Sequence, residues 1–402
     1  MILRYLLILA CLFSLTGLAR AAPPWKLDRI IVTFWLPPPV TDEALARVAA
    51  EHYTMTWTPA DGLDVAARHG LRAMLQDGLL TPASLDDPAQ KAKLDALIDR
   101  VKSHPALEAY FITDEPNAAA FPALGRLVAY LRERDPAHLA YINLFPTYAS
   151  NAQLGTTGDV VTAYREHLRL YVEIVKPGLI SYDHYQLFKN MDTPQYFLNL
   201  ELVREAALEA GVPFLNIVQA GDGEPVWRFP NADEMRYLIY TTLAYGGRGI
   251  SYFVYWGSAK YRGIYVDGKP SELAPALAKL NEEIGALSPE LLKLDSLGVY
   301  HTEPLPWGGH AVPADSPVQI VGPGEFVLGL FGAGGKVTSF MIANRSHKES
   351  AAARLRVAEG VKRLQEFDRA SRKWRSYTAP GANGVITVEL RPGDGRLFRM
   401  AK

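Results

Sequence analysis

Two adjacent acids, Asp114 and Glu115, end an apolar run in the stretch Tyr110–Asn117, which reads YFITDEPN. Adjacent carboxylates repel each other, so a buried strand that ends on such a pair points to a chemical role. Asp183 stands in a comparable position in the run SYDHY. Carboxyl groups that meet in a cleft can act as general acid, general base or nucleophile. These acids are therefore the first candidates for catalysis.

The elements that position these acids follow a repeating pattern from about residue 28 to about residue 290. Eight short apolar runs, typical of buried strands, alternate with segments whose apolar residues recur at i, i+3 and i+4, as in amphipathic helices. Eight such units predict a (β/α)8 TIM barrel, an α/β fold, over residues 24–292. An open doubly wound sheet is the alternative, but no G-x-G-x-x-G motif follows the first run.

The pattern changes near residue 296, where long helical periodicity ends. Short apolar runs separated by glycine and proline continue to the end of the chain, as in GPGEFVLGLFG. Such a sequence is typical of a β-sandwich. We therefore expect an all-β sandwich domain over residues 296–402.

Residues 1–21 have the features of a secretory signal peptide. Arg4 gives the positive start, an apolar run follows, and Ala19-Arg20-Ala21 matches a cleavage site. The single cysteine, Cys11, lies within this segment. We therefore expect a secreted or periplasmic bacterial protein that has no disulfide and no membrane contact after cleavage.

In a (β/α)8 barrel, catalytic groups lie at the carboxyl ends of the strands. Those ends carry acids, amides, aromatic rings and one histidine, and no lysine or arginine, which disfavours a phosphorylated substrate. Acids combined with aromatic faces favour a carbohydrate substrate. The residues expected to bind it are Trp35, Trp57, Asp77, Asp114, Asn143, Tyr182, His184, Tyr185, Gln219, Trp227, Tyr252 and Trp256.

Other classes of ligand have less support in the sequence. The net charge is −1 and no basic stripe is present, so we expect no nucleic-acid partner. No two histidines stand at ligand spacing, so we expect neither a metal nor another cofactor. The sequence makes no prediction of the oligomeric state.

The end of the fourth run resembles that of clan A glycoside hydrolases, retaining (β/α)8 enzymes in which strand four ends in an Asn-Glu pair. The resemblance implies that Glu115 is the catalytic acid/base and that Trp256 forms the floor of a sugar subsite. The added C-terminal sandwich is similar to that of β-galactosidase-type enzymes, family 42 and its relatives. Together these features imply a secreted glycoside hydrolase that cleaves O-glycosidic bonds of oligo- or polysaccharides.

The seventh run departs from the clan A pattern. Clan A places the nucleophilic Glu at the end of strand seven, where this chain has Gln219, and a neutral amide cannot be the nucleophile. We favour Asp183 as the second catalytic carboxylate, with Glu224 or an inverting reaction as alternatives. The run SYDHY also resembles the strand-six Tyr-Asp pair of chitinase-like glycosidases, in which the substrate's N-acetyl group attacks. Thr113 stands where that family has a further acid.

Two other functions stay open. The missing strand-seven Glu also fits a non-catalytic carbohydrate-binding protein on the same scaffold, and tyrosine and histidine at strand ends also fit a lyase. Strand parity predicts that Asp114 points away from the face that Glu115 uses, where it orients neighbours or contacts a sugar hydroxyl. As a general acid, Glu115 needs a raised pKa, which Phe111, Trp57 and Trp256 are expected to provide by desolvation.

Overall fold

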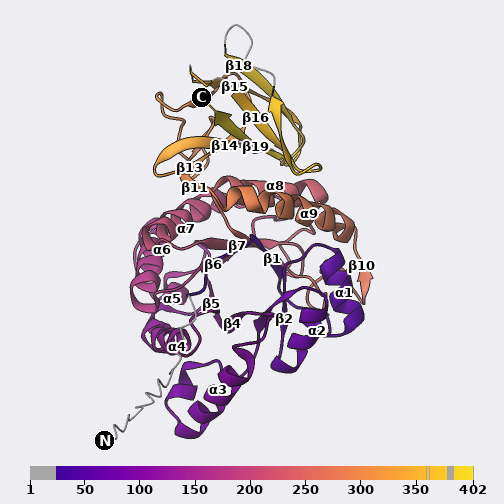
Figure 1. Ribbon diagram of the computed structural model, residues 1–402. Coiled ribbons are helices and arrows are strands. Elements are labelled where there is room, and N and C mark those ends of the chain that lie inside the picture. The colour runs from indigo at the N-terminus through magenta and orange to yellow at the C-terminus, as the bar shows by residue number, and fades with distance from the viewer. Residues whose placement is uncertain (1–23, 359, 362, 378–383, 402) are drawn as a thin grey trace, which may run out of the picture.

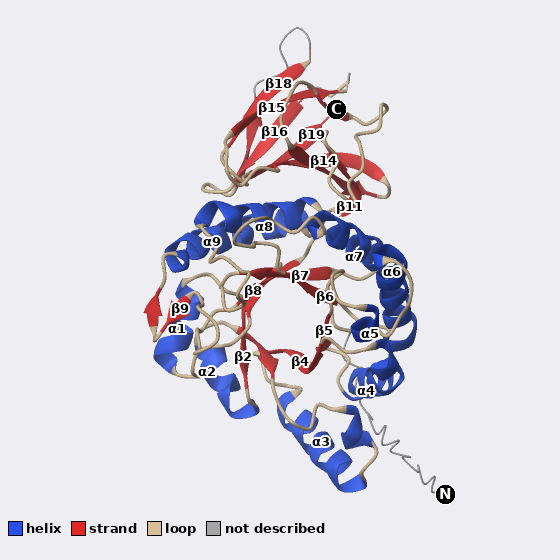
Figure 2. Ribbon diagram, turned by 180° about the vertical axis from the view of Figure 1, so that it is seen from behind, coloured by secondary structure: helices blue, strands red, loops and turns tan. Residues whose placement is uncertain are grey.

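The computed structural model describes residues 24–358, 360–361, 363–377 and 384–401. The predicted signal peptide and Cys11 lie outside the described residues. Figure 1 shows a ring of strands surrounded by helices, with an all-β unit lying against α8 and α9. Figure 2 shows the same arrangement from behind, with the strands in red and the helices in blue. The predicted (β/α)8 barrel followed by a β-sandwich is confirmed.

Each of the eight apolar runs contains one strand of a parallel sheet, in the order β1-β8-β7-β6-β5-β4-β3-β2. The sheet closes into a barrel where β1 meets β2. There the Thr54 N–H donates to the Val32 carbonyl at 2.9 Å. The strands are β1 (Ile31–Phe34), β2 (Met55–Thr58), β3 (Arg72–Leu75), β4 (Leu107–Asp114), β5 (Leu139–Leu144), β6 (Ile180–His184), β7 (Phe214–Gln219) and β8 (Gly249–Phe253).

The helices cover the outside of the barrel, because their apolar faces pack on the outward-facing strand residues. They are α1 (Asp42–Ala50), α2 (Leu63–Arg68), α3 (Pro88–Val101), α4 (Phe121–Arg134), α5 (Asn151–Leu154), α6 (Val160–Leu170), α7 (Tyr196–Ala210), α8 (Ala232–Ala244) and α9 (Leu273–Leu291). Short helical turns add Ala60–Gly62, Pro82–Leu85, Ala118–Ala120 and Tyr171–Val175, and the hairpin β9 (Tyr265–Val266) and β10 (Lys269–Pro270) follows β8.

The C-terminal unit consists of two antiparallel sheets with apolar side chains between them. One sheet contains β11 (Asp295–His301), β13 (Phe326–Ala333), β14 (Lys336–Asn344), β19 (Gly395–Ala401), β16 (Arg363–Asp368) and β17 (Lys373–Tyr377). The other contains β12 (Val318–Ile320), β15 (Ala351–Val357) and β18 (Val385–Leu390). Alternate burial along β15 and β18 follows the two-residue period expected of a sandwich.

The sandwich packs directly on the barrel through α8. A Cβ added at Gly329 of β13 would lie 2.2 Å from the Ala244 carbonyl oxygen, so a side chain there would prevent this contact. Val327 and Phe331 of the same strand belong to the core of the barrel. Because α8 lies between β8 and the sandwich, it is buried around almost its whole circumference. In the part of the chain that the structure describes, no helix is long and apolar enough to cross a membrane.

Candidate active site

A cavity of about 200 Å³ lies at the carboxyl ends of the barrel strands, where a (β/α)8 barrel places its chemistry. Its lining combines acids and one amide from β4 and the residue after it, β5 and β6. Aromatic rings come from β8 and from the loops that follow β1, β6, β7 and β8. The lining residues are Trp35, Asp114, Glu115, Asn143, Asp183, Tyr185, Trp227, Phe253 and Tyr261.

Asn143 of β5 joins the acids of the two neighbouring strands. Its Nδ2 donates to Oδ1 of Asp114 at 3.0 Å and to Oδ1 of Asp183 at 2.9 Å. Its Oδ1 accepts a hydrogen bond from the Ser181 hydroxyl at 3.0 Å, which fixes the orientation of the amide. Asn143 and Asp183 are each only 2% exposed. Asn143 therefore holds both carboxylates in fixed positions within the cavity.

Glu115 and Asp183 lie within hydrogen-bonding contact of each other. Two carboxyl groups in such contact are a stable arrangement only when a proton is shared between them. A retaining glycosidase separates its catalytic carboxyl groups by about 5–5.5 Å and an inverting one by about 6.5–9.5 Å. The structure therefore places Asp183 beside Glu115, and the role of Asp183 as the second catalytic carboxylate stays a prediction.

The environment of the acids raises their pKa values. Burial, and then the charge of Asp114, raise the pKa of Glu115 to about 7, while the hydrogen bond with Asp183 acts in the opposite direction. Burial and the charge of Glu115 raise the pKa of Asp183 well above its usual range. Burial also raises the pKa of Asp114, and the bond from Asn143 partly offsets this. The cluster therefore retains a proton near neutral pH.

Asp114 and Glu115 both face the cavity, which contradicts the prediction from strand parity. The pairing of β4 with β5 slips by one residue between Phe111 and Thr113, so the alternation of side chains is broken there. Glu115 then adopts a φ of +45°, a left-handed conformation that a non-glycine residue rarely adopts. Its N–H still donates to the Asn143 carbonyl at 2.9 Å. The bulge and this conformation turn both carboxylates into the same cavity.

Aromatic rings form the rest of the cavity wall. The Tyr185 ring lies 4.8 Å from that of Trp227 and 5.0 Å from that of Phe253, measured between centroids. The Tyr261 ring meets Phe253 edge-on at 5.1 Å. Trp57 is 2% exposed and packs beneath Trp35, so it supports the cavity floor and does not line it. Rings in this arrangement suit the apolar faces of a sugar.

Three residues predicted to bind substrate point away from the cavity. Tyr182 and His184 flank Asp183 in β6, and the two-residue period of a strand sends their side chains outward. His184 bonds to Asn199 of α7 at 2.9 Å, and burial lowers its pKa to about 4. The Tyr252 hydroxyl donates to Asn281 of α9 at 2.7 Å. All three are 0% exposed, and none of them lines the cavity.

Four other candidates lie near the mouth but do not line the cavity. Gln219 is used structurally, because its amide bonds to the backbone of Leu187 and to the carbonyls of Gly221 and Arg228. The Asp77 carboxylate accepts from the Leu79 N–H in a turn, and Trp256 stacks on Tyr265. The alternative acid Glu224 pairs with Lys260 at 2.8 Å. None of them provides the missing strand-seven carboxylate.

Sequence reasoning missed Phe253 and Tyr261 in the cavity lining. Phe253 is the last residue of β8, and the two-residue period that sends Tyr252 outward turns Phe253 inward. The alternation of side chains within the run GISYF could therefore have identified Phe253 as a residue that faces the cavity. Tyr261 lies in the loop after β8, and no local pattern in the sequence indicates where that loop folds.

The sandwich contacts the loops that carry the aromatic wall. His347, which follows β14, bonds through Nε2 to Asp192 at 2.7 Å. The Asp192 carboxylate accepts from the Arg228 guanidinium at 2.6 Å, and the same guanidinium binds Glu234 at the start of α8. Arg228 is next to Trp227 in the chain. This chain of contacts from His347 to Arg228 therefore fixes the position of a cavity-lining ring.

Replacing His347 with Ala is expected to raise KM about three- to tenfold, with little change in kcat. The change removes the hydrogen bond to Asp192, which in turn binds Arg228, the residue next to Trp227. The measurement is steady-state kinetics on any glycoside that the protein hydrolyses. His310→Ala is the matched control, since His310 is more exposed and meets only Glu201 at 3.7 Å. Equal KM values for the two variants would show that the His347 contact does not act on the site.

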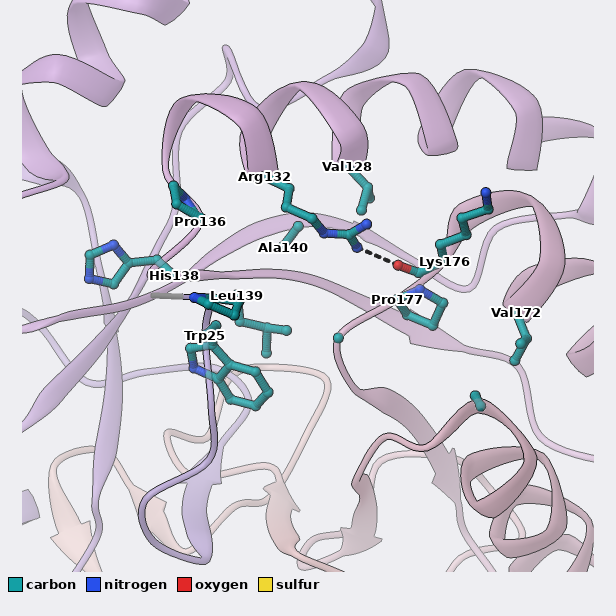
Figure 3. A pocket seen from close by; sticks show the side chains of 13 residues that line it. Trp25, Val128, Arg132, Pro136, His138, Leu139, Ala140, Val172, Lys176 and Pro177 are labelled. Carbon is teal, nitrogen blue, oxygen red and sulfur yellow. Dashed lines mark hydrogen bonds between the residues drawn. The ribbon is translucent and has the colours of Figure 1, made fainter. Parts of the chain in front are cut away.

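A second cavity, of about 400 Å³, lies at the opposite end of the barrel, beside the start of β5 and β6. Figure 3 shows Trp25, His138, Arg132 and Lys176 around it, with Arg132 donating to the Lys176 carbonyl. None of its lining residues is acidic. In a (β/α)8 barrel this end serves stability, so it is not the candidate site.

The chain is thus a (β/α)8-barrel protein with a C-terminal β-sandwich and an acid cluster at the carboxyl ends of its strands. No family model and no curated protein matches it. It is similar to the structure of a family 39 glycoside hydrolase from the gut symbiont Bacteroides cellulosilyticus WH2, with a TM-score of 0.50 and 11% identity over 92% of this chain and 81% of the other.

Two other structural matches are weaker. A β-galactosidase from the psychrophilic Marinomonas ef1 gives a TM-score of 0.45 and 11% identity over 66% of this chain and 60% of the other. An endo-β-1,4-mannanase from Thermotoga petrophila gives 0.42 and 10% over 91% and 92%. The likeness to the family 39 enzyme shows the fold, a (β/α)8 barrel with a C-terminal β-sandwich, and the fold alone. Membership of family 42 stays a prediction.

Proposed function

We propose that this protein is a secreted glycoside hydrolase that cleaves O-glycosidic bonds with Glu115 as general acid. The observation that carries the proposal is the position of Glu115. It stands at the carboxyl end of β4, in contact with Asp183 and opposite a wall of aromatic rings. Such a wall suits a sugar ring, and a protonated carboxyl group beside it can protonate a leaving oxygen.

The residues around Glu115 have separate roles in this proposal. Partial burial in the cavity raises the pKa of Glu115, which keeps it protonated until a glycosidic oxygen approaches. Asp183 acts through Glu115 and is a positioning residue, because it is buried and shares a hydrogen bond with the acid. Trp35 and Trp227 provide faces on which a sugar ring can stack. Once the leaving group has departed, a water molecule forms a bond to the anomeric carbon, and the Glu115 carboxylate takes the proton that this water loses.

A non-catalytic carbohydrate-binding protein is the other function that the missing strand-seven Glu supports. A binding site has no need of a strained backbone, yet Glu115 has a φ of +45° and a strongly raised pKa. Strain and shifted pKa values together are typical of catalytic groups. The hydrolase therefore accounts for more of the geometry.

The test is a panel of aryl glycosides and polysaccharides, assayed for product and stereochemistry across pH 4 to 9. A glutamic acid with a pKa of about 7 keeps its proton below that pH and loses it above. We therefore expect kcat/KM to fall as pH rises through about 7, whereas an ordinary glutamate would give a fall near 4.3. Binding of glycans without turnover on any member would favour the carbohydrate-binding function.

A further inference from the structure

Two exposed aromatic rings lie outside the cavity. Among the aromatic side chains of the described residues, only Tyr148 and Trp307 are exposed, at 43% and 45%. Tyr148 lies in the loop after β5 and Trp307 in the loop after β11. An exposed flat ring is a surface on which the apolar face of a sugar can stack. Both rings are therefore candidates for contacts with the part of a substrate that extends beyond the cavity.

The Tyr148 side chain is held at its polar end, beside the acids. Its hydroxyl accepts a hydrogen bond from the N–H of the cavity-lining Tyr185 at 3.2 Å. Its ring meets that of His184 edge-on, with 5.0 Å between the centroids. Burial of the hydroxyl, and then the charge of Asp183, raise the pKa of Tyr148 well above its usual range. The hydroxyl is therefore buried near the acid cluster, while part of the ring stays exposed.

The loop that carries Trp307 is anchored at two points. Gly308 packs on the first turn of α7, where an added Cβ would lie 2.5 Å from the Cα of Leu198. On the side of the sandwich, the buried Arg345 guanidinium donates to the Pro304 carbonyl at 2.7 Å. Such a fixed loop loses little conformational freedom when its exposed ring binds a ligand.

The start of α7 links the two rings. It follows the loop after β6, so it lies at the carboxyl end of the strands, as the cavity does. His184, which contacts Tyr148, lies 5.7 Å from the Tyr196 ring of this first turn, measured between centroids. Leu198, two residues further on, contacts the loop of Trp307. The two rings therefore lie at the same end of the molecule, one on the barrel and one on the sandwich.

The position of Glu115 gives the direction in which a substrate extends. A general acid protonates the oxygen of the bond that breaks, so the leaving part of the substrate lies beyond Glu115. Glu115 directly follows β4, and Tyr148 follows the neighbouring strand β5. The cavity volume of about 200 Å³ is below the ~300–1,000 Å³ usual for larger ligands. Further sugar units of a leaving group therefore have to bind outside the cavity, on the side of Tyr148.

We propose that the substrate is a long glycan chain whose leaving part binds along the surface from Tyr148, over the start of α7, to Trp307. The inference rests on the proposed function, because the general acid Glu115 sets the direction of the chain. Each ring stacks on one sugar unit, so the C-terminal unit takes part in substrate recognition. A chain that reaches both rings gains from both contacts at once, which a monosaccharide glycoside cannot do.

The first test measures binding by affinity electrophoresis in gels that contain hydroxyethyl cellulose, laminarin, galactomannan, arabinoxylan, pullulan or pectin. We expect at least one of these polysaccharides to retard the wild-type protein. Tyr148→Ala and Trp307→Ala should each weaken binding to it about 2- to 10-fold, the effect of losing one aromatic contact. The double variant should lose about the product of the two factors, because the rings bind separate sugar units.

Conservative and control variants make the result specific to the rings. Trp307→Phe keeps a flat ring and should lose less binding than Trp307→Ala. Leu208→Ala is the matched control, because Leu208 is 50% exposed in the last turn of the same helix α7, at the opposite end of the barrel. It should be retarded as strongly as the wild type. Thermal melting checks that every variant is folded.

Kinetics form the second test. We compare kcat/KM on the retarding polysaccharide with kcat/KM on 4-nitrophenyl β-D-glucoside, β-D-galactoside, β-D-mannoside and β-D-xyloside. The alanine variants of Tyr148 and Trp307 should lose at least about threefold more activity on the polysaccharide than on any aryl glycoside, because only the polymer reaches both rings. An equal loss on both kinds of substrate would overturn the inference.

The outcomes separate this inference from the proposed function. Hydrolysis of glycosides with no retardation by any polysaccharide, or with retardation that neither alanine variant weakens, would overturn the inference and leave the glycosidase in place. Retardation that depends on both rings, without hydrolysis of any substrate, would overturn the proposed function instead. A dimer that Trp307→Ala dissociates in sedimentation, without retardation of the wild type, would show that the ring contacts a second copy of the chain, and would also overturn the inference.

Discussion

Replacing Glu115 with Gln is expected to lower kcat by about 10²–10⁴ on glycosides with poor leaving groups, because the leaving oxygen then has no proton donor. The glutamine keeps the shape of the side chain but has no carboxyl proton to transfer. The loss should be smaller for 2,4-dinitrophenyl glycosides, because that leaving group departs without protonation. Steady-state rates across a series of leaving groups measure the effect.

Two comparisons make the Glu115 result specific. Glu224→Gln changes an acid near the mouth that is paired with Lys260 and does not line the cavity, so its rates should match the wild type. Thermal melting of Glu115→Gln checks that the left-handed turn at residue 115 still forms. A folded Glu115→Gln variant with turnover within about threefold of the wild type on a poor leaving group would rule out the assignment, since loss of a general acid costs more.

Replacing Asp183 with Asn is expected to move the alkaline limb of the pH profile to lower pH. Loss of the last proton from the native pair would place two negative charges side by side, so the pair stays protonated to higher pH. This repulsion outweighs the hydrogen bond with Asp183, which by itself lowers the pKa of Glu115. An amide at position 183 can donate a hydrogen bond to ionised Glu115, and it cannot carry a negative charge beside that carboxylate. Both effects favour the ionised form and lower the pKa of Glu115.

The size of the Asp183 effect follows from that shift. Each unit by which the pKa of Glu115 falls leaves about tenfold less protonated acid at a pH above it. We therefore expect kcat/KM at pH 7 to fall by about 10- to 100-fold, with a smaller loss at pH 5. A loss that is equal at every pH would instead mean that Asp183 only supports the local structure. Asp77→Asn should leave both limbs unchanged, because Asp77 is outside the acid cluster.

The chain of contacts from the sandwich to Trp227 gives the C-terminal unit a role beyond covering α8. His347 reaches the loop after β6 through Asp192, and Arg228 connects that loop to the start of α8. The loops after β6 and β7 carry Tyr185 and Trp227. The sandwich therefore stabilises the aromatic side of the cavity, while the acidic side depends on the barrel strands themselves.

The sequence by itself determined the elements, because local periodicity encodes them. Each apolar run became a barrel strand, and the position of Glu115 at the end of the fourth run was enough to place it at the catalytic end of the barrel. Parity applied along β6 would also have separated Asp183 from Tyr182 and His184, since neighbouring residues of a strand face opposite sides. These features depend on neighbours within one segment.

Only the tertiary structure decided how the acids meet. The direction of Asp114 depends on a bulge in the pairing of β4 with β5 and on the left-handed backbone at Glu115, and neither has a sequence signature. The contact between Glu115 and Asp183 depends on the register of three strands that are far apart in the chain. Likewise, His347 reaches Asp192 only because the sandwich docks on α8. Such contacts join distant segments, so their geometry is set when the barrel closes and its two units pack together.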